Sequence, residues 1–412
     1  MELKPGYKLT EVGVIPEDWE DVRLGEIAEI RMCKRVFHQQ TTATGEIPFF
    51  KIGTFGKEPD AFISSSLYQD YKKKYSFPQK GDILLSAAGT LGRTVVYGGE
   101  DAYFQDSNIV WLDVDKGKIS NEYLYYCYQT IKWASPEGST ISRLYNGIIK
   151  STKIALPPTI EEQRAIAQAL SDVDALLAAQ EQLIAKKRDL KQAAMQQLLT
   201  GKTRLPGFSG EWAEKKLGDL ITHCSSGATP RRNRPEFFKG DIKWITSGEL
   251  NYNTITDTIE KISREAVEET NLTIHPTGTF LMAITGLEAE GTRGACGIIG
   301  SPATTNQSCM AVFPTSELAT EYLFHYYIFK GKTLALQYCQ GTKQQSYTAG
   351  IVKQLPIKLP PTRDEQIAIA SALFDMDAEI SALEARREKT RAIKQAMMQE
   401  LLTGKTRLIA TA

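Results

Sequence analysis

The chain has 412 residues, of which 42% are hydrophobic and 24% charged, so it has a globular composition and length enough for two domains with connecting segments. Its 49 basic and 49 acidic residues cancel, which leaves only local clusters to attract nucleic acid. No apolar run could cross a bilayer and residues 1–6 lack the apolar core of a signal peptide, which predicts a cytoplasmic protein. The six cysteines form no Cys-x-x-Cys pair and the four histidines are scattered, so we expect reduced thiols and no zinc site.

A first globular region is predicted over residues 1–155, with mixed α/β structure. Short runs rich in β-branched and aromatic residues, bounded by glycine turns, indicate strands at 47–52, 82–86 and 94–97. An amphipathic helix is expected around residues 122–126.

A long helix is predicted next, within residues 156–205. Proline is tolerated just before a helix but not inside one, so Leu-Pro-Pro at 156–158 marks its start, and Gly201 suits its end. Apolar residues then recur with alternating steps of four and three, which is the spacing of a coiled-coil seam. Forty helical residues, from 161 to 200, would make a rod of roughly 60 Å at 1.5 Å per residue.

The chain then repeats this plan. A second globular region is predicted over residues 206–358, with strands at 241–245 and 279–284 and a helix around 321–325. The segment 359–412 contains the second long helix, and 31 of the 50 residues in 359–408 are identical to 156–205 at a constant offset of 203. The two globular regions differ much more than the helices, which suggests one scaffold that carries two different binding domains.

We therefore expect an α+β protein in which two similar globular domains are separated by two long helices. If the helices pair antiparallel, their starts lie at opposite ends, and each globular region joins the start of its own helix. The predicted arrangement is an antiparallel coiled coil with approximate two-fold symmetry. It would hold the two domains at a fixed separation, like a ruler.

Motifs for catalysis are absent or weak in the sequence. Gly-Lys-Thr occurs three times, but the glycine that a P-loop needs five residues earlier is replaced each time, by Gln196, Tyr326 and Gln399. Neither Leu-Pro-Pro-Thr resembles the (Asn/Asp)-Pro-Pro-(Tyr/Phe) loop of an amino-methyltransferase. Asp241-Ile242-Lys243 fits part of a nuclease motif, although such a triplet more often belongs to an ordinary strand edge.

Clusters of basic and amide side chains indicate nucleic-acid binding. Guanidinium groups bind phosphate or guanine, and amides suit adenine. Arginine clusters precede a β-rich run at the same place in both halves, which favours a shared role over a solvated surface. Charge reversal of the second cluster is expected to weaken DNA binding. The candidate DNA-binding residues are Arg31, Lys34, Arg35, Lys72, Lys73, Arg93, Arg143, Arg231, Arg232, Arg234, Arg293, Asn306, Gln307, Lys343 and Gln344. The run Lys186-Lys187-Arg188 on the first helix is interpreted as a solvated face instead.

The duplicated segment resembles the helical regions of type I restriction–modification specificity subunits. It opens with Leu-Pro-Pro, continues through Glu-Gln and Ile-Ala, and ends in Leu-Leu-Thr-Gly-Lys-Thr-Arg-Leu, at 198–205 and 401–408. Ile-Pro-x-x-Trp at 15–19, Lys-Gly-Asp-Ile-Leu-Leu-Ser at 80–86 and Gly227-x-Thr229-Pro230 are similar to the recognition domains of that family. The first half shows no clear Gly-x-Thr-Pro.

The resemblance implies a subunit that has no catalytic activity or cofactor of its own. It would read a split site in double-stranded DNA and hold two methyltransferase subunits that use S-adenosylmethionine. Restriction subunits that use ATP and magnesium would join them. The rod of roughly 60 Å, less the reach of the domains, would suit half-site centres about one turn of B-DNA apart or somewhat more. Two alternatives remain open: a coiled-coil scaffold whose globular ends bind proteins, and a solitary nuclease that uses Asp241 and Lys243.

Overall fold

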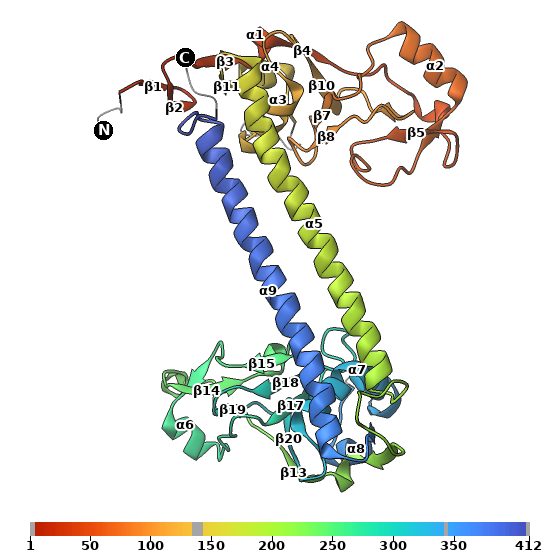
Figure 1. Ribbon diagram of the computed structural model, residues 1–412, viewed down its shortest axis with the longest axis vertical. Coiled ribbons are helices and arrows are strands. Elements are labelled where there is room, and N and C mark those ends of the chain that lie inside the picture. Colours follow the sequence, from red (N-terminus) through yellow and green to blue (C-terminus); the bar gives the residue numbers. More distant parts are fainter. Residues whose placement is uncertain (1–4, 134–142, 342–344, 409–412) are drawn as a thin grey trace. The chain divides into compact units, whose positions relative to one another are not determined.

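The chain divides into two compact units (Figure 1) in the computed structural model, which describes residues 5–133, 143–341 and 345–408. The first unit comprises residues 1–181 and 386–412, and the second comprises residues 182–385. Each unit therefore contains one globular region together with part of each long helix.

The first globular region has mixed α/β structure, as the sequence predicts. Its strands are β1 (Tyr7–Thr10), β2 (Gly13–Pro16), β3 (Glu20–Arg23), β4 (Ala28–Arg31), β5 (Ile47–Phe50), β6 (Phe62–Ile63), β7 (Ile83–Ser86), β8 (Thr94–Val96), β9 (Tyr103–Phe104), β10 (Ile109–Val114) and β11 (Lys153–Leu156). Its helices are α1 (Leu24–Ile27), η1 (His38–Gln40), α2 (Ser65–Lys74), α3 (Asn121–Thr130) and α4 (Asn146–Ser151).

Two sheets organise this region. The main sheet has the antiparallel order β4-β10-β7-β8. Its apolar residues form a core with α3 and with the start of the long helix α5 (Ile160–Leu198). A smaller sheet has the order β6-β5-β9, in which β5 and β9 are parallel. This smaller sheet and α2 form what we call the first outer lobe, which lies beyond the main sheet as seen from the long helix (Figure 1).

The second globular region follows the element order of the first from β3 onward, with η4 and β15 added and with no counterpart of the hairpin β1–β2 among the described residues. Its strands are β12 (Ala213–Lys216), β13 (Ile221–Ser226), β14 (Ile242–Ile245), β15 (Asn253–Ile255), β16 (Lys261–Ile262), β17 (Phe280–Ala283), β18 (Cys296–Ile299), β19 (Ala303–Thr305), β20 (Cys309–Pro314) and β21 (Pro356–Leu359). Its helices are η2 (Leu217–Asp219), η3 (Pro235–Phe238), η4 (Ser247–Glu249), α6 (Arg264–Glu269), α7 (Thr320–Tyr338) and α8 (Ala349–Gln354).

The sheet topology of the first region recurs in the second. The main sheet β13-β20-β17-β18 repeats the order β4-β10-β7-β8, with β15 added in parallel at its edge. The sheet β16-β14-β19 repeats β6-β5-β9, including its parallel pair, and forms the second outer lobe together with α6. The two regions are therefore copies of one fold, although their sequences have diverged.

Each globular region continues into a long helix, α5 (Ile160–Leu198) or α9 (Arg363–Leu401). These bounds lie within two residues of the predicted 161–200 and its equivalent in the second copy. Within the described part of the chain, no helix combines the length and the apolar character that crossing a membrane requires.

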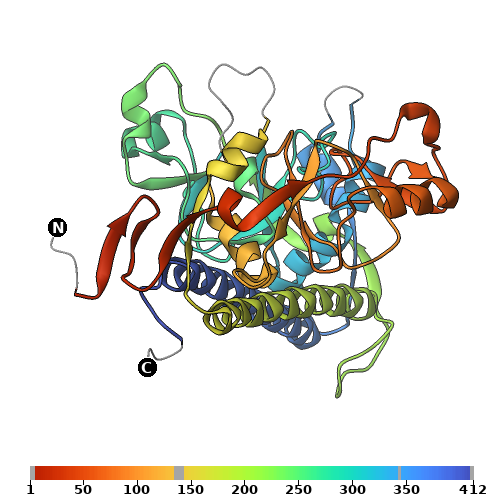
Figure 2. The same cartoon turned by 90° about the horizontal axis from the view of Figure 1, so that it is seen from above.

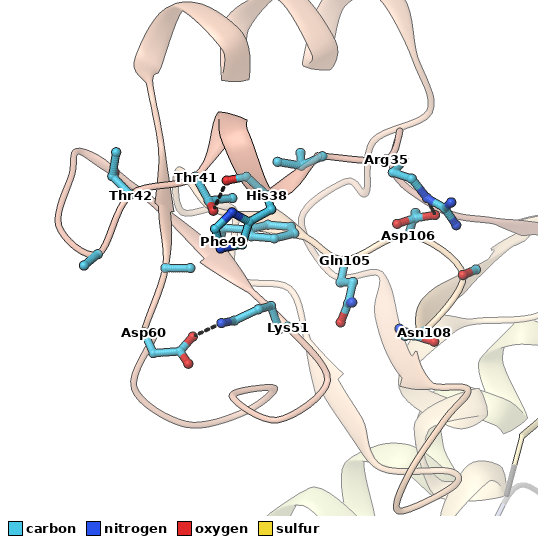
Figure 3. Close-up of a pocket in the computed structure, with 14 residues that line it drawn as sticks. Arg35, His38, Thr41, Thr42, Phe49, Lys51, Asp60, Gln105, Asp106 and Asn108 are labelled. Atoms are coloured by element: carbon cyan, nitrogen blue, oxygen red, sulfur yellow. Dashed lines mark hydrogen bonds and ion pairs between the residues drawn. The ribbon is translucent and has the colours of Figure 1, made fainter. Parts of the chain in front are cut away.

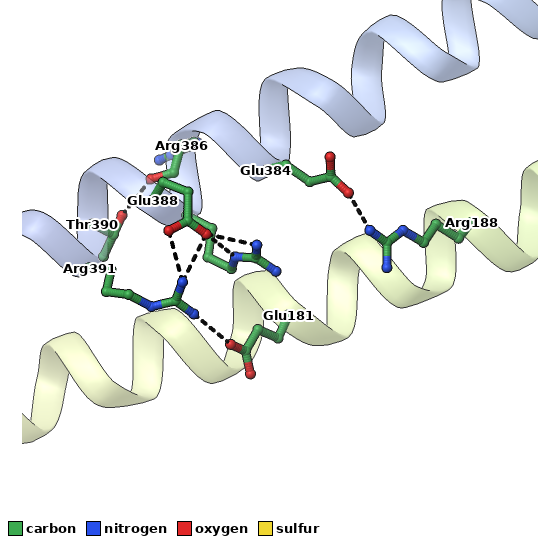
Figure 4. A network of polar contacts seen from close by, with 8 residues as sticks. Glu181, Arg188, Glu384, Arg386, Glu388, Thr390 and Arg391 are labelled. Carbon is green, nitrogen blue, oxygen red and sulfur yellow. Dashed lines mark hydrogen bonds and ion pairs between the residues drawn. The ribbon is translucent and has the colours of Figure 1, made fainter. Parts of the chain in front are cut away.

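Segments of α5 and α9 contact each other within both units, and their partners run in opposite sequence directions. In the first unit, Asp174 pairs with Lys394 at 2.7 Å, and Glu181 pairs with Arg391 at 3.5 Å. In the second unit, α5 pairs with α9 through Lys187–Glu379 at 2.6 Å, Lys191–Asp377 at 2.5 Å and Arg188–Glu384 (Figure 4). Lys186 and Arg188 are exposed, as the interpretation of 186–188 as a solvated face expects, whereas the paired Lys187 side chain is only 30% exposed and departs from it.

A buried glutamate in the first turn of each long helix binds an arginine that follows the end of the other helix. In the first unit, Arg407 pairs with Glu162, which is 2% exposed, and also with Asp18 at 3.0 and 3.1 Å. In the second unit, both oxygens of the fully buried Glu365 accept bonds of 2.5 Å from Arg204. We call these two ion pairs the clasps.

A glutamine next to each clasp glutamate ties the helix to its own globular region. Gln163 accepts a hydrogen bond from the Ser120 amide at 2.9 Å and donates one to the Lys118 carbonyl at 2.9 Å. Gln366 makes the same two bonds with Ala319 at 2.8 Å and with Glu317 at 2.9 Å. The start of each helix is therefore fixed to its globular region by buried polar contacts.

The end of α9 packs against the entry to the first region. Hairpin β1–β2 lies beside it (Figure 2), and the Tyr7 hydroxyl donates to the Gly404 carbonyl at 3.3 Å. Gly404 has a φ of +68°, and a Cβ there would lie 2.6 Å from Pro16, so only glycine fits. Gly201 has a φ of +71° and packs on Trp212 in the same way.

Removing a clasp arginine is expected to destabilise its unit strongly. Arg407→Ala leaves the buried Glu162 carboxylate unpaired, which should cost roughly 3–5 kcal/mol in the free energy of unfolding. Arg391→Ala is the matched control, because its side chain is 54% exposed and loss of its exposed ion pairs should cost less than about 1 kcal/mol. Urea unfolding followed by tryptophan fluorescence measures both. Equal losses in the two variants would show that the clasp contributes no more than a surface pair.

His325 on α7 is a buried histidine that the packing keeps neutral. It is fully buried, its ring lies 4.4 Å from the Phe374 ring, and neither ring nitrogen has a hydrogen-bond partner among the described residues. Burial, with a further effect of nearby Lys191, lowers the pKa of His325 to about 3. In the unfolded chain the pKa of this histidine is about 6.5, so it binds a proton below that pH. The folded unit does not bind this proton until the pH approaches 3.

The stability of the second unit should consequently fall as the pH drops from about 6.5 towards 3. At pH 5 the contribution of His325 is about 2 kcal/mol, since the interval is about 1.5 pH units at 1.36 kcal/mol each. His325→Phe should remove this part of the acid destabilisation, as measured by urea unfolding at pH 7.5 and pH 5.0. An identical loss between the two pH values in wild type and variant would contradict the assignment.

Candidate nucleic-acid interface

In each globular region, the loop that follows the outer strand of the main sheet (β4 or β13) contacts the loop that precedes the neighbouring strand (β10 or β20). In the second region, the Thr229 hydroxyl donates to the side-chain oxygen of Gln307 at 2.5 Å. In the first, Arg35 pairs with Asp106 at 2.8 Å. The strand registers β4–β10 and β13–β20 place Arg35 at the position of Thr229.

The same registers identify the first region's counterpart of Gly-x-Thr-Pro as Cys33-Lys34-Arg35-Val36. Gly227 is required in the second region, because a Cβ there would lie 1.8 Å from the Thr305 carbonyl. Cys33 occupies this place in the first region and is buried. The first half therefore carries Cys-Lys-Arg-Val where the second carries Gly-Ala-Thr-Pro.

Two of the predicted cations of the first region meet at one loop, residues 105–108. Arg35 binds Asp106 on this loop and keeps 60% of its side chain exposed. Arg143 donates to the Ser107 carbonyl at 3.3 Å. The structure thus brings together two arginines that are more than 100 residues apart in sequence.

The other predicted cations of the first region lie at separate places. Arg31 pairs with Glu29 at 2.6 Å and with Asp113 at 3.5 Å on the main sheet. Lys72 donates to the Tyr68 hydroxyl at 2.7 Å, and Arg93 donates to the Phe55 carbonyl at 2.7 Å. Lys34 lies 5.1 Å from the Tyr75 ring centre, and Lys73 is exposed on α2.

The three arginines of the second cluster differ in what they bind. Arg232 makes two bonds to Glu260, at 2.5 and 2.8 Å, and lies 4.3 Å from the Phe238 ring centre. Arg234 pairs with three carboxylates of its own lobe, Glu236, Glu265 and Glu269, at 2.7–2.8 Å. Hydrogen bonds to Glu236 and Glu269 raise the pKa of Arg234 further above its ordinary value. Arg231 is exposed and has no ion-pair partner among the residues that the structure describes.

These contacts pair Arg232 and Arg234 with carboxylates of the second outer lobe, so we expect these two arginines to contribute less to DNA binding than Arg231 does. Arg293 is likewise bound within its own loop, to the carbonyls of Leu287 and Glu288 at 2.9 Å. Asn306 and Gln307 lie in the loop next to Thr229. Lys343 and Gln344 fall outside the described residues.

The structure adds residues that the sequence did not single out. The side chains of Gln105 and Asn108 belong to the loop contacted by Arg35 and Arg143, and His38 and Lys51 line the same cavity (Figure 3). The strand pattern before β10 and β20 could have found Gln105, because Gln-Asp-Ser-Asn precedes one strand and Asn-Gln-Ser precedes the other.

The residues of the alternative nuclease motif do not converge on a site. Asp241 is exposed, and the Lys243 amine donates to the Ser301 hydroxyl at 2.5 Å. The described residues contain no group of three or more His, Cys, Asp or Glu side chains placed to hold a metal ion.

The fold and these paired loops define a protein with two copies of one binding domain, each joined to a long helix. Residues 16–186 and 209–392 match the type I restriction modification DNA specificity domain, and the chain belongs to this family. Specificity subunits are the non-catalytic members of type I restriction–modification systems, so the chain is not an enzyme on its own.

Individual relatives agree with this membership. A stretch of 145 residues, 35% of this chain, is 56% identical to a Haemophilus influenzae protein provisionally named as a type I restriction enzyme specificity subunit, and it spans 38% of that relative. The type I restriction enzyme MjaVIII specificity subunit of Methanocaldococcus jannaschii is 24% identical over 96% of this chain and 94% of its own length. The crystal structure of a type I restriction–modification S subunit from M. genitalium has the same fold, with a TM-score of 0.60 and 14% identity over 97% of this chain and 99% of its own.

The contacts of the second cluster predict different effects for its arginines. Arg231→Ala should weaken DNA binding several-fold and reduce the slope of log affinity against log salt by about one, with no change in thermal stability. Arg234→Ala should lower the melting temperature and leave that slope unchanged, because its charge is held by three glutamates. Fluorescence anisotropy at several salt concentrations measures the slope. A normal slope for Arg231→Ala would show that this arginine does not contact DNA.

Proposed function

We propose that this chain reads a bipartite site in double-stranded DNA for a type I restriction–modification complex. Each globular region would be a target recognition domain that contacts one half-site. The observation that carries this proposal is the repeated pair of loops, at 33–36 with 105–108 and at 227–230 with 306–308. Both pairs lie at the same place in the fold and carry cationic or amide side chains. Such side chains bind phosphates and base edges.

The proposed division of the chain follows the sequence repeat. Residues 1–155 and 206–358 would be the recognition domains, and residues 156–205 and 359–412 the helical regions. We infer that the helices form one antiparallel coiled coil with approximate two-fold symmetry. Within each unit, later residues of α5 pair with earlier residues of α9, which supports an antiparallel arrangement. The clasp in each unit supports it as well. A coiled coil of this kind would set the distance between the half-sites.

The helices also offer a surface for partner subunits. Leu176, Leu183 and Leu190 follow one another at intervals of seven along α5, and each is 41–47% exposed. Leucines at one heptad position share a helix face, and an exposed apolar face favours contact with another protein. We propose that methyltransferase subunits, two per specificity chain, dock on the helices, and that restriction subunits join them.

Catalysis would then belong entirely to the partners. The methyltransferase subunits would use S-adenosylmethionine, the restriction subunits would use ATP and magnesium, and this chain would need no cofactor. A subunit that reads cellular DNA in this way would act in the cytoplasm.

The proposal is tested by comparing the isolated chain with the assembled methyltransferase complex. The isolated chain should bind DNA with an affinity that falls steeply with salt, and it should neither methylate nor cut DNA. The complex should methylate adenines in two short half-sites separated by a fixed spacer, mapped by sequencing of methylated DNA. A chain without salt-dependent DNA affinity, in a complex that methylates no bipartite site, would instead be a protein-binding scaffold.

A further inference from the structure

The loops 105–108 and 306–308 are equivalent in backbone hydrogen bonding. The Gln105 amide donates to the Phe50 carbonyl at 2.9 Å, and the Asn306 amide donates to the Ile245 carbonyl at 2.9 Å. On the other side, the carbonyls of Asn108 and Ser308 accept from Ala87 at 2.7 Å and from Ile284 at 2.9 Å. Gln105 is therefore the structural counterpart of Asn306, in a loop that links the outer lobe to the main sheet.

The first loop contains one residue more than the second between these equivalent bonds. Ser107 absorbs the difference with a φ of +54°, a left-handed conformation that residues other than glycine rarely adopt. Its carbonyl is bound by Arg143, and the preceding Asp106 is bound by Arg35. Two arginines therefore hold the loop in place. The left-handed residue Ser107 lies between Gln105 and Asn108, which both line one cavity.

That cavity has a volume of about 540 Å³ and lies between the loop and the outer lobe. Gln105 and Asn108 line it together with Arg35, His38, Phe49 and Lys51. In Figure 3 the side chain of Gln105 lies between those of Lys51 and Asn108. The lining also contains Asp106 and Asp60, which pair with Arg35 at 2.8 Å and with Lys51 at 2.9 Å, so the amides are the lining groups with hydrogen-bonding capacity left for a base edge.

The two amide side chains differ in the hydrogen bonds they have left to offer. The oxygen of Gln105 accepts the Ile52 amide at 2.9 Å, so its NH₂ group supplies donors to a ligand. Among the described residues the Asn108 side chain has no hydrogen-bond partner, so it offers both a donor and an acceptor. In the major groove, a donor suits the O6 and N7 of guanine or the O4 of thymine, whereas a free amide suits adenine.

We propose that Gln105 and Asn108 are specificity-determining residues of the first recognition domain and contact base edges of its half-site. Gln105 reads an acceptor, guanine or thymine, and Asn108 reads adenine. Arg35 and Arg143 hold the loop in position, and Asn306 takes the equivalent place in the second domain. This inference rests on the proposed function.

The test uses the full chain assembled with its methyltransferase subunits and a library of DNA sites randomised at each half-site position. Gln105→Glu keeps the acceptor for the Ile52 amide and replaces the NH₂ donors, and Asn108→Ala removes an amide without a partner. Each should relax or change the base preference at one position of the same half-site, by about ten- to hundredfold in relative methylation rate. The other half-site should keep its preference.

Two matched controls separate base reading from other effects. Gln39→Glu adds the same charge as Gln105→Glu at an exposed residue of η1 that does not line the cavity, and should change affinity without changing base preference. Asn306→Asp should alter only the opposite half-site. An unchanged preference at both half-sites in Gln105→Glu and Asn108→Ala, with wild-type melting temperatures, would overturn the inference. A wild-type complex without any bipartite preference would overturn the proposed function itself.

Discussion

The fold depends on a buried charge that each long helix carries in its first turn. The carboxylates of Glu162 and Glu365 are removed from water, so each requires a partner in place of the solvent. That partner is an arginine from beyond the end of the other helix, Arg407 or Arg204. Each clasp therefore joins a globular region, the start of its helix and the end of the other helix. This arrangement agrees with the opposite sequence directions in which α5 and α9 pair within each unit.

Much of the fold could be predicted from sequence, because its signals are local or duplicated. The Leu-Pro-Pro starts, the glycine ends and the apolar spacing located α5 and α9 to within two residues. The clasps were not predictable in this way, since their partners lie 245 and 161 positions apart. The same holds for Lys187 and Arg188, whose carboxylate partners lie on the other helix.

The candidate interface was predictable only in part. Arginine clusters were recognised by composition, but the partners of Arg232 and Arg234 lie up to 35 residues away and become visible only when the outer lobe is folded. Polar residues with amide side chains precede both β10 and β20, but the first loop has one residue more than the second, so the sequence alone does not align Gln105 with Asn306. The fold shows this correspondence through the hydrogen bonds to Phe50 and Ile245. Binding loops of this kind vary in length while the strands that hold them stay in register.

We propose that the two paired helices set the distance between two DNA-reading domains, and a change in helix length tests this proposal. Insertion of one seven-residue repeat at matching positions of both helices keeps the apolar seam in register and adds about 10 Å, or about three base pairs. Mapping of methylated sites should show that the original spacer is lost and a longer one is preferred. Methylation of the original spacer at the wild-type rate would show that the helices do not set this distance.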